Sequence, residues 1–338
     1  MRSKGIKTFN KKKFSLSFTF GCNSNRFPPP PVVIPTNFSI TTAIELMQLT
    51  ADAYTQYNQF KNNNEWTILP PYELKNSLYV YEKNEQGGGL PIPFGFIAEK
   101  IIDANNVDLY ICFRGTKNVE DWKKNISVPL VSCPFLPLDK NIKVHKGFQD
   151  VYIDNTYVNS LRSQVLDYLN KRPVSSYNNL WVAGHSLGGA VATLAIIDII
   201  TNTSHSNVKM YNFASPLVGN QEFADFFKSK IGTNKCNDDN NINACSWRVV
   251  NKNDVVTKIP PTATGGYIHV NGCSGQSVCN NVSNNNNGYT NVNNGIFQIE
   301  VGKECGLSSL FFDPKCFISA HVSDAYLNEL LRIKLLNQ

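Results

Sequence analysis

The chain has 338 residues, of which 42% are hydrophobic, 11% aromatic and 17% charged, a composition typical of a globular protein. Its formal net charge is +6, but residues 1–44 hold seven basic and no acidic residues, so the remainder is nearly neutral. A nucleic-acid-binding surface on the main part of the chain is therefore not indicated, and no apolar run approaches the length of a membrane span.

Residues 1–36 are interpreted as a basic, Pro-rich tail, and residues 37–338 as one folded domain. Four consecutive prolines at 28–31 form a stiff spacer that marks the boundary. Basic residues followed by Phe-Ser-Leu-Ser-Phe-Thr-Phe at 14–20 are similar to a signal peptide. The acid-poor, Ser-containing composition also fits a transit peptide or a plain basic arm. These three interpretations of the tail stay open.

Hydrophobic patterns predict an alternation of helices and strands along the rest of the chain. The expected helices are 40–60, a short piece at 119–125, 150–170, 190–200, 223–231 and 322–336. The expected strands are 78–81, 93–98, 107–113, 180–183, 208–213 and 246–250. Residues 271–295 are rich in Asn and Gly and predict a loop or a low-complexity insert. The alternation predicts an α/β fold with a mostly parallel sheet and helices on both faces.

The stretch 180–190 carries the strongest chemical signal. A short apolar run passes through Gly-His-Ser-Leu-Gly-Gly and continues as an apolar helix. A strand, a G-x-S-x-G turn and a helix make the context of a nucleophile elbow. Gly184 and Gly188 leave out side chains that would clash with neighbouring backbone. Ser186 is therefore predicted at the top of the sheet, at the N-terminus of a helix.

A serine nucleophile needs a histidine base, and the base needs a carboxylate that fixes its tautomer. On this fold the chain order is Ser, then acid, then His. Asp254 follows the strand 246–250 and is the predicted acid. His321 precedes the last helix and is the predicted base, with His269 as the alternative. Among the histidines that precede Asp254, His145 and His185 are expected to be structural.

An oxyanion formed beside Ser186 needs two hydrogen-bond donors. The backbone N–H of Leu187, directly after the nucleophile, is one. The other is expected from the loop that ends the strand 107–113, where Gly115 allows close approach and Thr116 offers an N–H and a hydroxyl. The alternative role for Thr116 is the N-cap of the segment that follows.

Nine cysteines are present, and three pairs lie close together in loop-like segments: Cys236 with Cys245, Cys273 with Cys279, and Cys305 with Cys316. This spacing suits local disulfides in a secreted protein, although the connectivity cannot be deduced. Cys112 lies in an apolar strand and is expected to be a buried free thiol. No C-x-x-C or H-x₃-H pair favours a metal site.

Taken together, these segments resemble the fungal-type lipases of the class 3 lipase family. The resemblance covers about residues 40–321. It implies an α/β-hydrolase core, a Ser186, Asp254 and His321 triad, oxyanion donors at Thr116 and Leu187, no metal or cofactor, and ester hydrolysis through an acyl-enzyme. The matching pieces are Phe-Arg-Gly-Thr at 113–116, Asp121 and Trp122 with Asn125, Val-His-Lys-Gly-Phe at 144–148, residues 184–189, Ala-Ser-Pro-Leu-Val-Gly-Asn at 214–220, residues 253–256 with Pro260 and Pro261, and His321.

Lipases of this family usually carry an amphipathic lid helix after the oxyanion strand. Here Val119, Trp122 and Ile126 would form its apolar stripe, among several charged residues. The expected substrate is an acylglycerol, with a feruloyl-type ester or a phospholipid ester as alternatives, and a catalytically silent lipid-binding protein as the non-enzyme alternative. The expected partners are the lipid or small ester and, transiently, a membrane or lipid-droplet surface. We expect a secretory location, the alternative being an intracellular, lipid-associated one.

Overall fold

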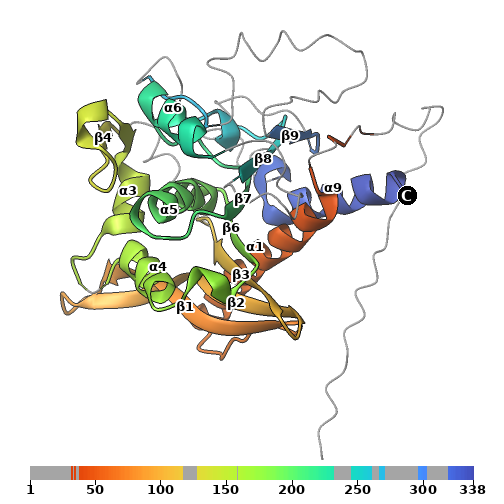
Figure 1. The fold of residues 1–338 in the computed structure, drawn as a ribbon, viewed down its shortest axis with the longest axis horizontal. Helices are drawn as coiled ribbons and strands as arrows, with labels where there is room; N and C mark the ends of the chain where they lie inside the picture. Colours follow the sequence, from red (N-terminus) through yellow and green to blue (C-terminus); the bar gives the residue numbers. More distant parts are fainter. Residues whose placement is uncertain are drawn as a thin grey trace, which may run out of the picture. The chain divides into compact units, whose positions relative to one another are not determined.

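A seven-stranded sheet with the order β1-β2-β3-β6-β7-β8-β9 lies at the centre of the described part of the chain (Figure 1). The antiparallel strands β1, β2 and β3 form one side of it, and β3, β6, β7, β8 and β9 pair in parallel. This is the α/β-hydrolase type of fold that the sequence predicts. The computed structural model describes residues 32, 34–35, 38–116, 128–157, 159–231, 245–260, 266–270, 296–302 and 319–338.

The strands of the main sheet are β1 Tyr72–Lys83, β2 Gly89–Asp103, β3 Asn106–Phe113, β6 Asn179–His185, β7 Val208–Phe213, β8 Cys245–Asn251 and β9 Ile296–Ile299. A small antiparallel pair consists of β4 Leu130–Ser132 and β5 Lys143–His145. The α-helices are α1 Ile40–Lys61, α3 Lys146–Ile153, α4 Leu161–Asn170, α5 Leu187–Asn202, α6 Gln221–Lys230 and α9 Ser323–Leu336. Short 3-10 turns are η1 Leu138–Lys140, η2 Val174–Ser176 and η3 Val256–Lys258.

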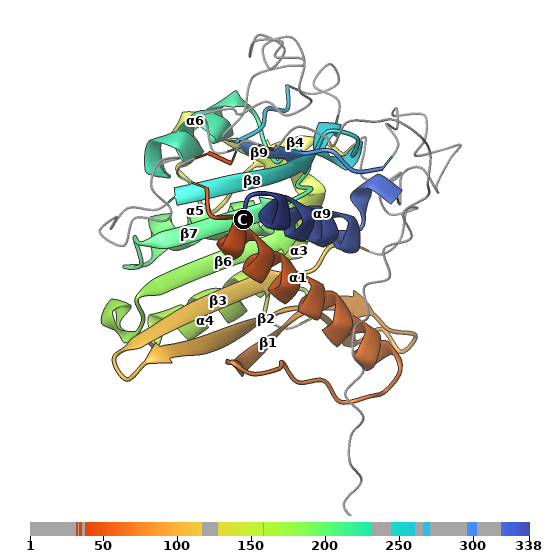
Figure 2. The same cartoon turned by 90° about the vertical axis from the view of Figure 1, so that its right-hand side faces the viewer.

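Helices cover both faces of the sheet, and the strands supply apolar side chains to each face in alternation. In β3, Ile111 belongs to one core cluster and Cys112 to the other. The first cluster packs under α3, α4, α5 and α6. The second packs under α1 and α9, which lie across the sheet in Figure 2. Strands buried on both sides explain why the sequence shows apolar runs and not strict alternation.

Most of the predicted elements are confirmed, and α1 agrees almost residue for residue with the expected helix 40–60. The predicted helix 150–170 is wrong, because it is two helices, α3 and α4. The Asp154 carboxylate accepts hydrogen bonds from the backbone N–H and the hydroxyl of Thr156, a local turn that competes with the helix. Ser160 then caps the start of α4 through the N–H of Ser163. The short strand β9 was not predicted.

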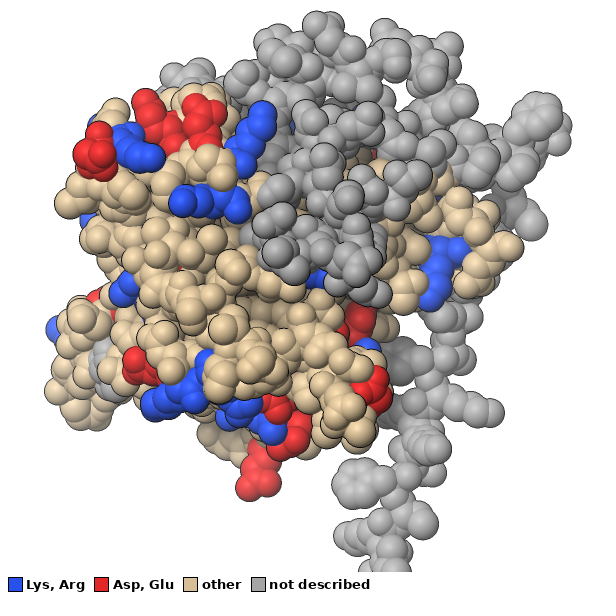
Figure 3. Space-filling view, in the orientation of Figure 1, with Lys and Arg blue, Asp and Glu red and all other residues tan. Residues whose placement is uncertain are grey.

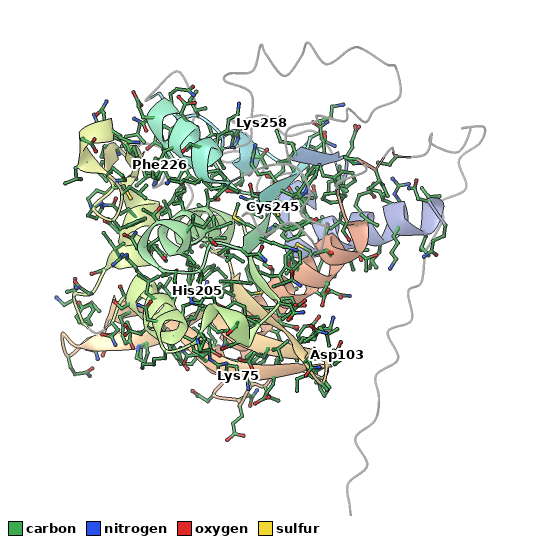
Figure 4. The ribbon with its side chains drawn as sticks, in the orientation of Figure 1. Lys75, Asp103, His205, Phe226, Cys245 and Lys258 are labelled. Atoms are coloured by element: carbon green, nitrogen blue, oxygen red, sulfur yellow. The ribbon has the colours of Figure 1, made fainter. Side chains whose placement is uncertain are left out.

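The described residues all fall in one compact unit, Pro31–Gln338, and no described helix is long and apolar enough to cross a membrane. Cys112 is a buried free thiol, as predicted, and Cys133 is a second one. Cys245 begins β8 near the middle of the fold (Figure 4). Among the described residues on the face shown in Figure 3, acidic and basic side chains lie close to one another and form no extended basic surface.

Asp52, on α1, provides a test of the packing between this helix and the sheet. Burial raises the pKa of its carboxyl from 3.8 to about 6. The folded chain therefore holds this proton more tightly than the unfolded chain, and the resulting contribution to stability is lost as the pH rises through about 6. We expect Asp52→Asn to stabilise the protein at pH 7 by on the order of 1–2 kcal/mol, after allowance for partial exposure, and much less at pH 4.

Urea unfolding at the two pH values measures this difference. Asp139→Asn, at an exposed position in η1, is the matched control and should change stability little at either pH. An equal gain for Asp52→Asn at pH 4 and pH 7 would show that the buried charge is not its source.

Candidate active site

Ser186 occupies the sharp turn between β6 and α5. Its backbone has φ 61° and ψ −126°, in the left-handed half of conformational space that non-Gly residues rarely adopt. Such a conformation costs on the order of 1–3 kcal/mol and persists only where the surroundings hold it. Because α5 begins at Leu187, the serine side chain lies at the N-terminus of a buried helix.

Three backbone segments hold the turn in place. A Cβ atom on Gly184 would lie 2.1 Å from the carbonyl oxygen of Gly188, and one on Gly188 would lie 2.4 Å from the carbonyl oxygen of Phe113. The N–H of Ser186 donates to the carbonyl oxygen of Phe213, at 2.9 Å. The turn is thus pressed against the end of β3 and bonded to the end of β7, and no side chain larger than hydrogen fits at its two glycines.

The side chains of Ser186, His321 and Asp254 lie in one hydrogen-bonded row. His321 Nε2 is 2.8 Å from Ser186 Oγ, and His321 Nδ1 is 2.8 Å from Asp254 Oδ2. Ser186 and Asp254 are fully buried, and His321 is nearly so. Asp254 comes just after β8 and His321 just before α9, so the carboxyl-end edge of the parallel strands brings the three together.

Asp254 has further donors besides the imidazole. Its Oδ2 also accepts from the Tyr326 hydroxyl at 2.8 Å, and its Oδ1 accepts from the N–H of Val256 at 2.9 Å. Nδ1 of His321 faces the Asp254 carboxylate and Nε2 faces the Ser186 hydroxyl. A neutral imidazole that donates from Nδ1 accepts a hydrogen bond at Nε2. The sequence analysis missed Tyr326, whose hydroxyl also accepts from the N–H of Asn251.

Tyr326 remains a donor because burial, followed by the nearby Asp254 carboxylate, holds the pKa of its hydroxyl well above the ordinary value. It lies on α9, five residues after His321, and is fully buried. An aromatic residue at this position of an amphipathic helix looks like an ordinary core residue, so no sequence signal identified its contact with Asp254.

The loop at the end of β3 runs directly beside the serine. A Cβ atom on Gly115 would lie 2.7 Å from the Cβ of Ser186. Arg114 fixes this loop, since its Nη1 donates to the carbonyl oxygen of Gly115 at 2.8 Å and its Nε to that of Pro93 at 2.7 Å. The guanidinium also lies 4.0 Å from the centre of the Tyr57 ring. The backbone directly before Thr116 is therefore held in place beside Ser186.

Leu187 is the other predicted oxyanion donor. It is the first residue of α5, where a backbone N–H has no acceptor within its own helix. The oxyanion roles of Thr116 and Leu187 remain predictions.

The alternative base, His269, is placed elsewhere. Its Nε2 lies 2.6 Å from the carbonyl oxygen of Thr257 and 3.1 Å from Arg248 Nη2. Burial, followed by the charge of Arg248, holds the pKa of His269 well below the ordinary value. His145 caps α3 and stacks on Phe148, with ring centres 3.8 Å apart. Both side chains thus have contacts within the fold.

The predicted lid residues Val119, Trp122 and Ile126 lie outside the described residues. No group of His, Cys, Asp or Glu in the described ranges is arranged to hold a metal ion. A cavity of about 530 Å³ is lined by Phe135, Arg162 and Thr201, among others. It opens near the C-terminal end of α5, a helix roughly 24 Å long, and is remote from Ser186 at the other end.

A strained serine between a strand and a helix, with histidine and aspartate in a row behind it, defines an α/β-hydrolase. Residues 110–264 match the family model of class 3 lipases. The chain is 35% identical over 164 residues to a lipase of Rhizomucor miehei, and the match covers 48% of this chain and 39% of that protein. It is 33% identical over 228 residues to a chloroplastic phospholipase A(1) of Arabidopsis thaliana, 57% of this chain and 48% of that one.

Among solved structures, the native propeptide complex of Rhizomucor miehei lipase superposes with a TM-score of 0.50 and 26% identity, over 72% of this chain and 70% of that one. Over residues 110–264 the chain thus resembles the class 3 lipases, and its fold is that of an α/β-hydrolase. It spans between about two fifths and one half of the length of the two curated relatives.

The elbow glycines differ in how tightly they are enclosed, and this difference is testable. We expect Gly184→Ala to lower the free energy of unfolding by about 3–5 kcal/mol, because the new methyl group would overlap backbone atoms that cannot move aside. Gly189 is the matched control, since a Cβ atom there lies 3.0 Å from the Ser215 Cβ as its nearest neighbour. Gly189→Ala should cost far less. Urea unfolding measures both, and equal losses would contradict the assigned crowding.

Proposed function

We propose that this protein is a serine hydrolase that cleaves carboxylic esters of acylglycerols through an acyl-enzyme. The observation that carries the proposal is the row of hydrogen bonds from Ser186 through His321 to Asp254. In this proposal the three are the nucleophile, the general base and the residue that orients the base. The silent lipid-binding alternative is disfavoured, because a complete triad has no role in a protein that only binds lipid.

The reaction follows from the geometry. Ser186 Oγ attacks the ester carbonyl carbon while its proton passes to His321 Nε2. The resulting oxyanion accepts hydrogen bonds from the N–H groups of Leu187 and Thr116, near the positive end of α5. As the tetrahedral intermediate collapses, the C–O bond to the alcohol breaks and His321 protonates the leaving oxygen. Water then attacks the acyl-enzyme with His321 as base, which releases the fatty acid and regenerates Ser186.

The acylglycerol substrate is supported by the similarity to the lipase of Rhizomucor miehei. A phospholipase A(1) activity is the second candidate, favoured by the similarity to proteins of that name from Arabidopsis thaliana and Oryza sativa. Both would cleave an acyl ester at the same triad and differ in the headgroup that the entrance must admit. A feruloyl-type esterase is the remaining alternative.

The burial of the serine supports a movable lid. Ser186 has no exposed surface and His321 is only 6% exposed, so a substrate reaches the hydroxyl only after a neighbouring segment has moved. In this proposal that segment contains Val119, Trp122 and Ile126, and a membrane or lipid-droplet surface stabilises the open state by burying them.

A secretory location is part of the proposal, with an intracellular, lipid-associated one as the alternative. The cysteines that lie close together in sequence, such as Cys236 and Cys245, suit local disulfides in an oxidising compartment. In the same proposal residues 37–338 form the hydrolase domain and residues 1–36 form a basic, Pro-rich tail.

The triad is tested by three substitutions. Ser186→Ala should abolish hydrolysis of a short soluble ester, and Asp254→Asn should lower kcat about 10⁴-fold, as in the serine-protease triad, because the wrong imidazole tautomer results. His321→Ala should lose at least as much. A fluorophosphonate probe should label the wild-type protein and leave Ser186→Ala unlabelled.

His269→Ala is the control for removal of a buried histidine. It should retain most of the activity of the folded protein, although its stability falls. An essential His269 beside a dispensable His321 would reverse the assignment, and equal labelling of wild type and Ser186→Ala would place the nucleophile elsewhere.

The lid and the substrate class are tested together. Burial of Trp122 with two aliphatic side chains is worth at most about 1.5–3 kcal/mol for each, and Lys123 and Lys124 add about 1 kcal/mol each at an anionic surface. We therefore expect a moderate rise in activity when a short ester exceeds its solubility limit, and a further rise with anionic lipid. Trp122→Ser should weaken both while hydrolysis of dissolved ester is nearly unchanged.

Triacylglycerol emulsions and phosphatidylcholine vesicles, offered in parallel, separate the two leading substrate classes. Release of fatty acid from the emulsion alone supports the lipase. Release of fatty acid from the vesicles alone supports a phospholipase and contradicts the lipase. Activity without any response to an interface or to Trp122→Ser would favour the soluble esterase.

A further inference from the structure

His185, directly before the nucleophile, uses both of its ring nitrogens. Its Nε2 lies 2.8 Å from the carbonyl oxygen of His321, and its Nδ1 lies 2.9 Å from the hydroxyl of Tyr54. A carbonyl oxygen can only accept, so Nε2 carries the proton and Nδ1 accepts from Tyr54. Burial, followed by the charge of His321, holds the pKa of His185 well below its ordinary value. The ring is therefore neutral, with a fixed tautomer.

Tyr54 continues the chain of hydrogen bonds to the other side of the serine. Burial raises the pKa of its hydroxyl, and a hydrogen bond from the backbone of Gly115 acts against that rise. The Tyr54 hydroxyl therefore lies against the backbone of the loop at Gly115. A Cβ atom on Gly115 would lie 2.4 Å from that oxygen, which explains why the loop carries glycine there.

The connected groups belong to four distant parts of the chain. Gly115 lies beside the predicted oxyanion donor, Thr116, and His321 is the proposed base. Tyr54 comes from α1, and His185 ends β6. The bonds from His185 span 131 residues to Tyr54 and 136 residues to His321. A row of four contacting groups thus connects the loop after β3 to the segment before α9.

We propose that Tyr54 and His185 are positioning residues that hold the oxyanion loop and the base in register around Ser186. This inference rests on the proposed esterase function. The hydrogen bond from His185 fixes the backbone of His321 itself, while Asn251 Nδ2 fixes the preceding carbonyl oxygen, that of Ala320, at 2.7 Å. The two anchors determine where the imidazole lies between Ser186 and Asp254.

The neutral state of His185 is also needed for catalysis. Its ring centre lies 4.9 Å from that of His321, which becomes an imidazolium as Ser186 attacks. A second positive charge at that distance would oppose the transition state. The groups that face His185 are Tyr54 from α1, His321, and Tyr326 from α9, whose ring centre lies 5.6 Å away.

The test compares Tyr54→Phe, His185→Leu and His185→Gln on a short soluble ester. Misplacement of a catalytic group by less than about 1 Å costs up to 10²-fold. We expect Tyr54→Phe and His185→Leu to lower kcat by about 10- to 100-fold with KM nearly unchanged. A looser contact between His321 and Asp254 stabilises the imidazolium less, so the acid limb of the pH profile should move to lower pH. His185→Gln keeps a donor for the His321 carbonyl and should recover most of the loss.

Two controls separate positioning from a general loss of stability. Rates are divided by the fraction of protein labelled with a fluorophosphonate after long exposure, so unfolded molecules do not count. Tyr211→Phe removes a tyrosine hydroxyl from a fully buried residue, one that bonds to the N–H of Ser39, and should leave kcat and the acid limb unchanged. Tyr54 and His185 act through the same row of hydrogen bonds. The double variant Tyr54→Phe/His185→Leu should therefore be no slower than the slower single variant.

Unchanged kcat and acid limb in Tyr54→Phe and His185→Leu would overturn the inference. So would losses that multiply in the double variant, or no recovery in His185→Gln. A wild-type protein without Ser186-dependent ester cleavage would instead refute the proposed function, which keeps the two failures distinct.

Discussion

The structure depends on how closely three backbone segments approach one another at Ser186. The carbonyl oxygens of Phe113 and Gly188 occupy the space where side chains would otherwise stand. Close packing of this kind is rigid, because backbone atoms cannot change rotamer as a side chain can. The cost of the left-handed serine conformation is therefore offset by the packing of the whole sheet edge, and the hydroxyl has one available position.

The buried charged groups near Ser186 each have several hydrogen-bond or aromatic partners. Asp254 could not be buried as a charge without donors on both of its oxygens, and it receives them from a histidine, a tyrosine and a backbone N–H. Arg114, also buried, is satisfied by two carbonyl oxygens and an aromatic face, without a neighbouring carboxylate in direct contact among its described partners. Asp254 orients the imidazole of His321, and Arg114 orients the loop at Gly115.

Sequence reasoning predicted the parts of the site that have local signals. The spacing of Gly184, Ser186 and Gly188 predicts the elbow, and Asp254 follows a recognisable buried strand. The contacts of Tyr326 with Asp254 and of Tyr54 with His185 have no such signal. Each contact joins residues more than 70 positions apart, and each tyrosine fits an ordinary helix face. The break between α3 and α4 depends on side-chain hydrogen bonds that outweigh a helical pattern.

The order of the segments along the chain has a consequence for synthesis. The serine lies between β6 and α5, in the middle of the chain, while its histidine comes 135 residues later. Proteins are made from the N-terminus, so the greater part of the sheet can form while the row beside Ser186 still lacks its imidazole. A nascent chain thus lacks the imidazole beside Ser186 until the segment that precedes α9 has been made and folded against the sheet.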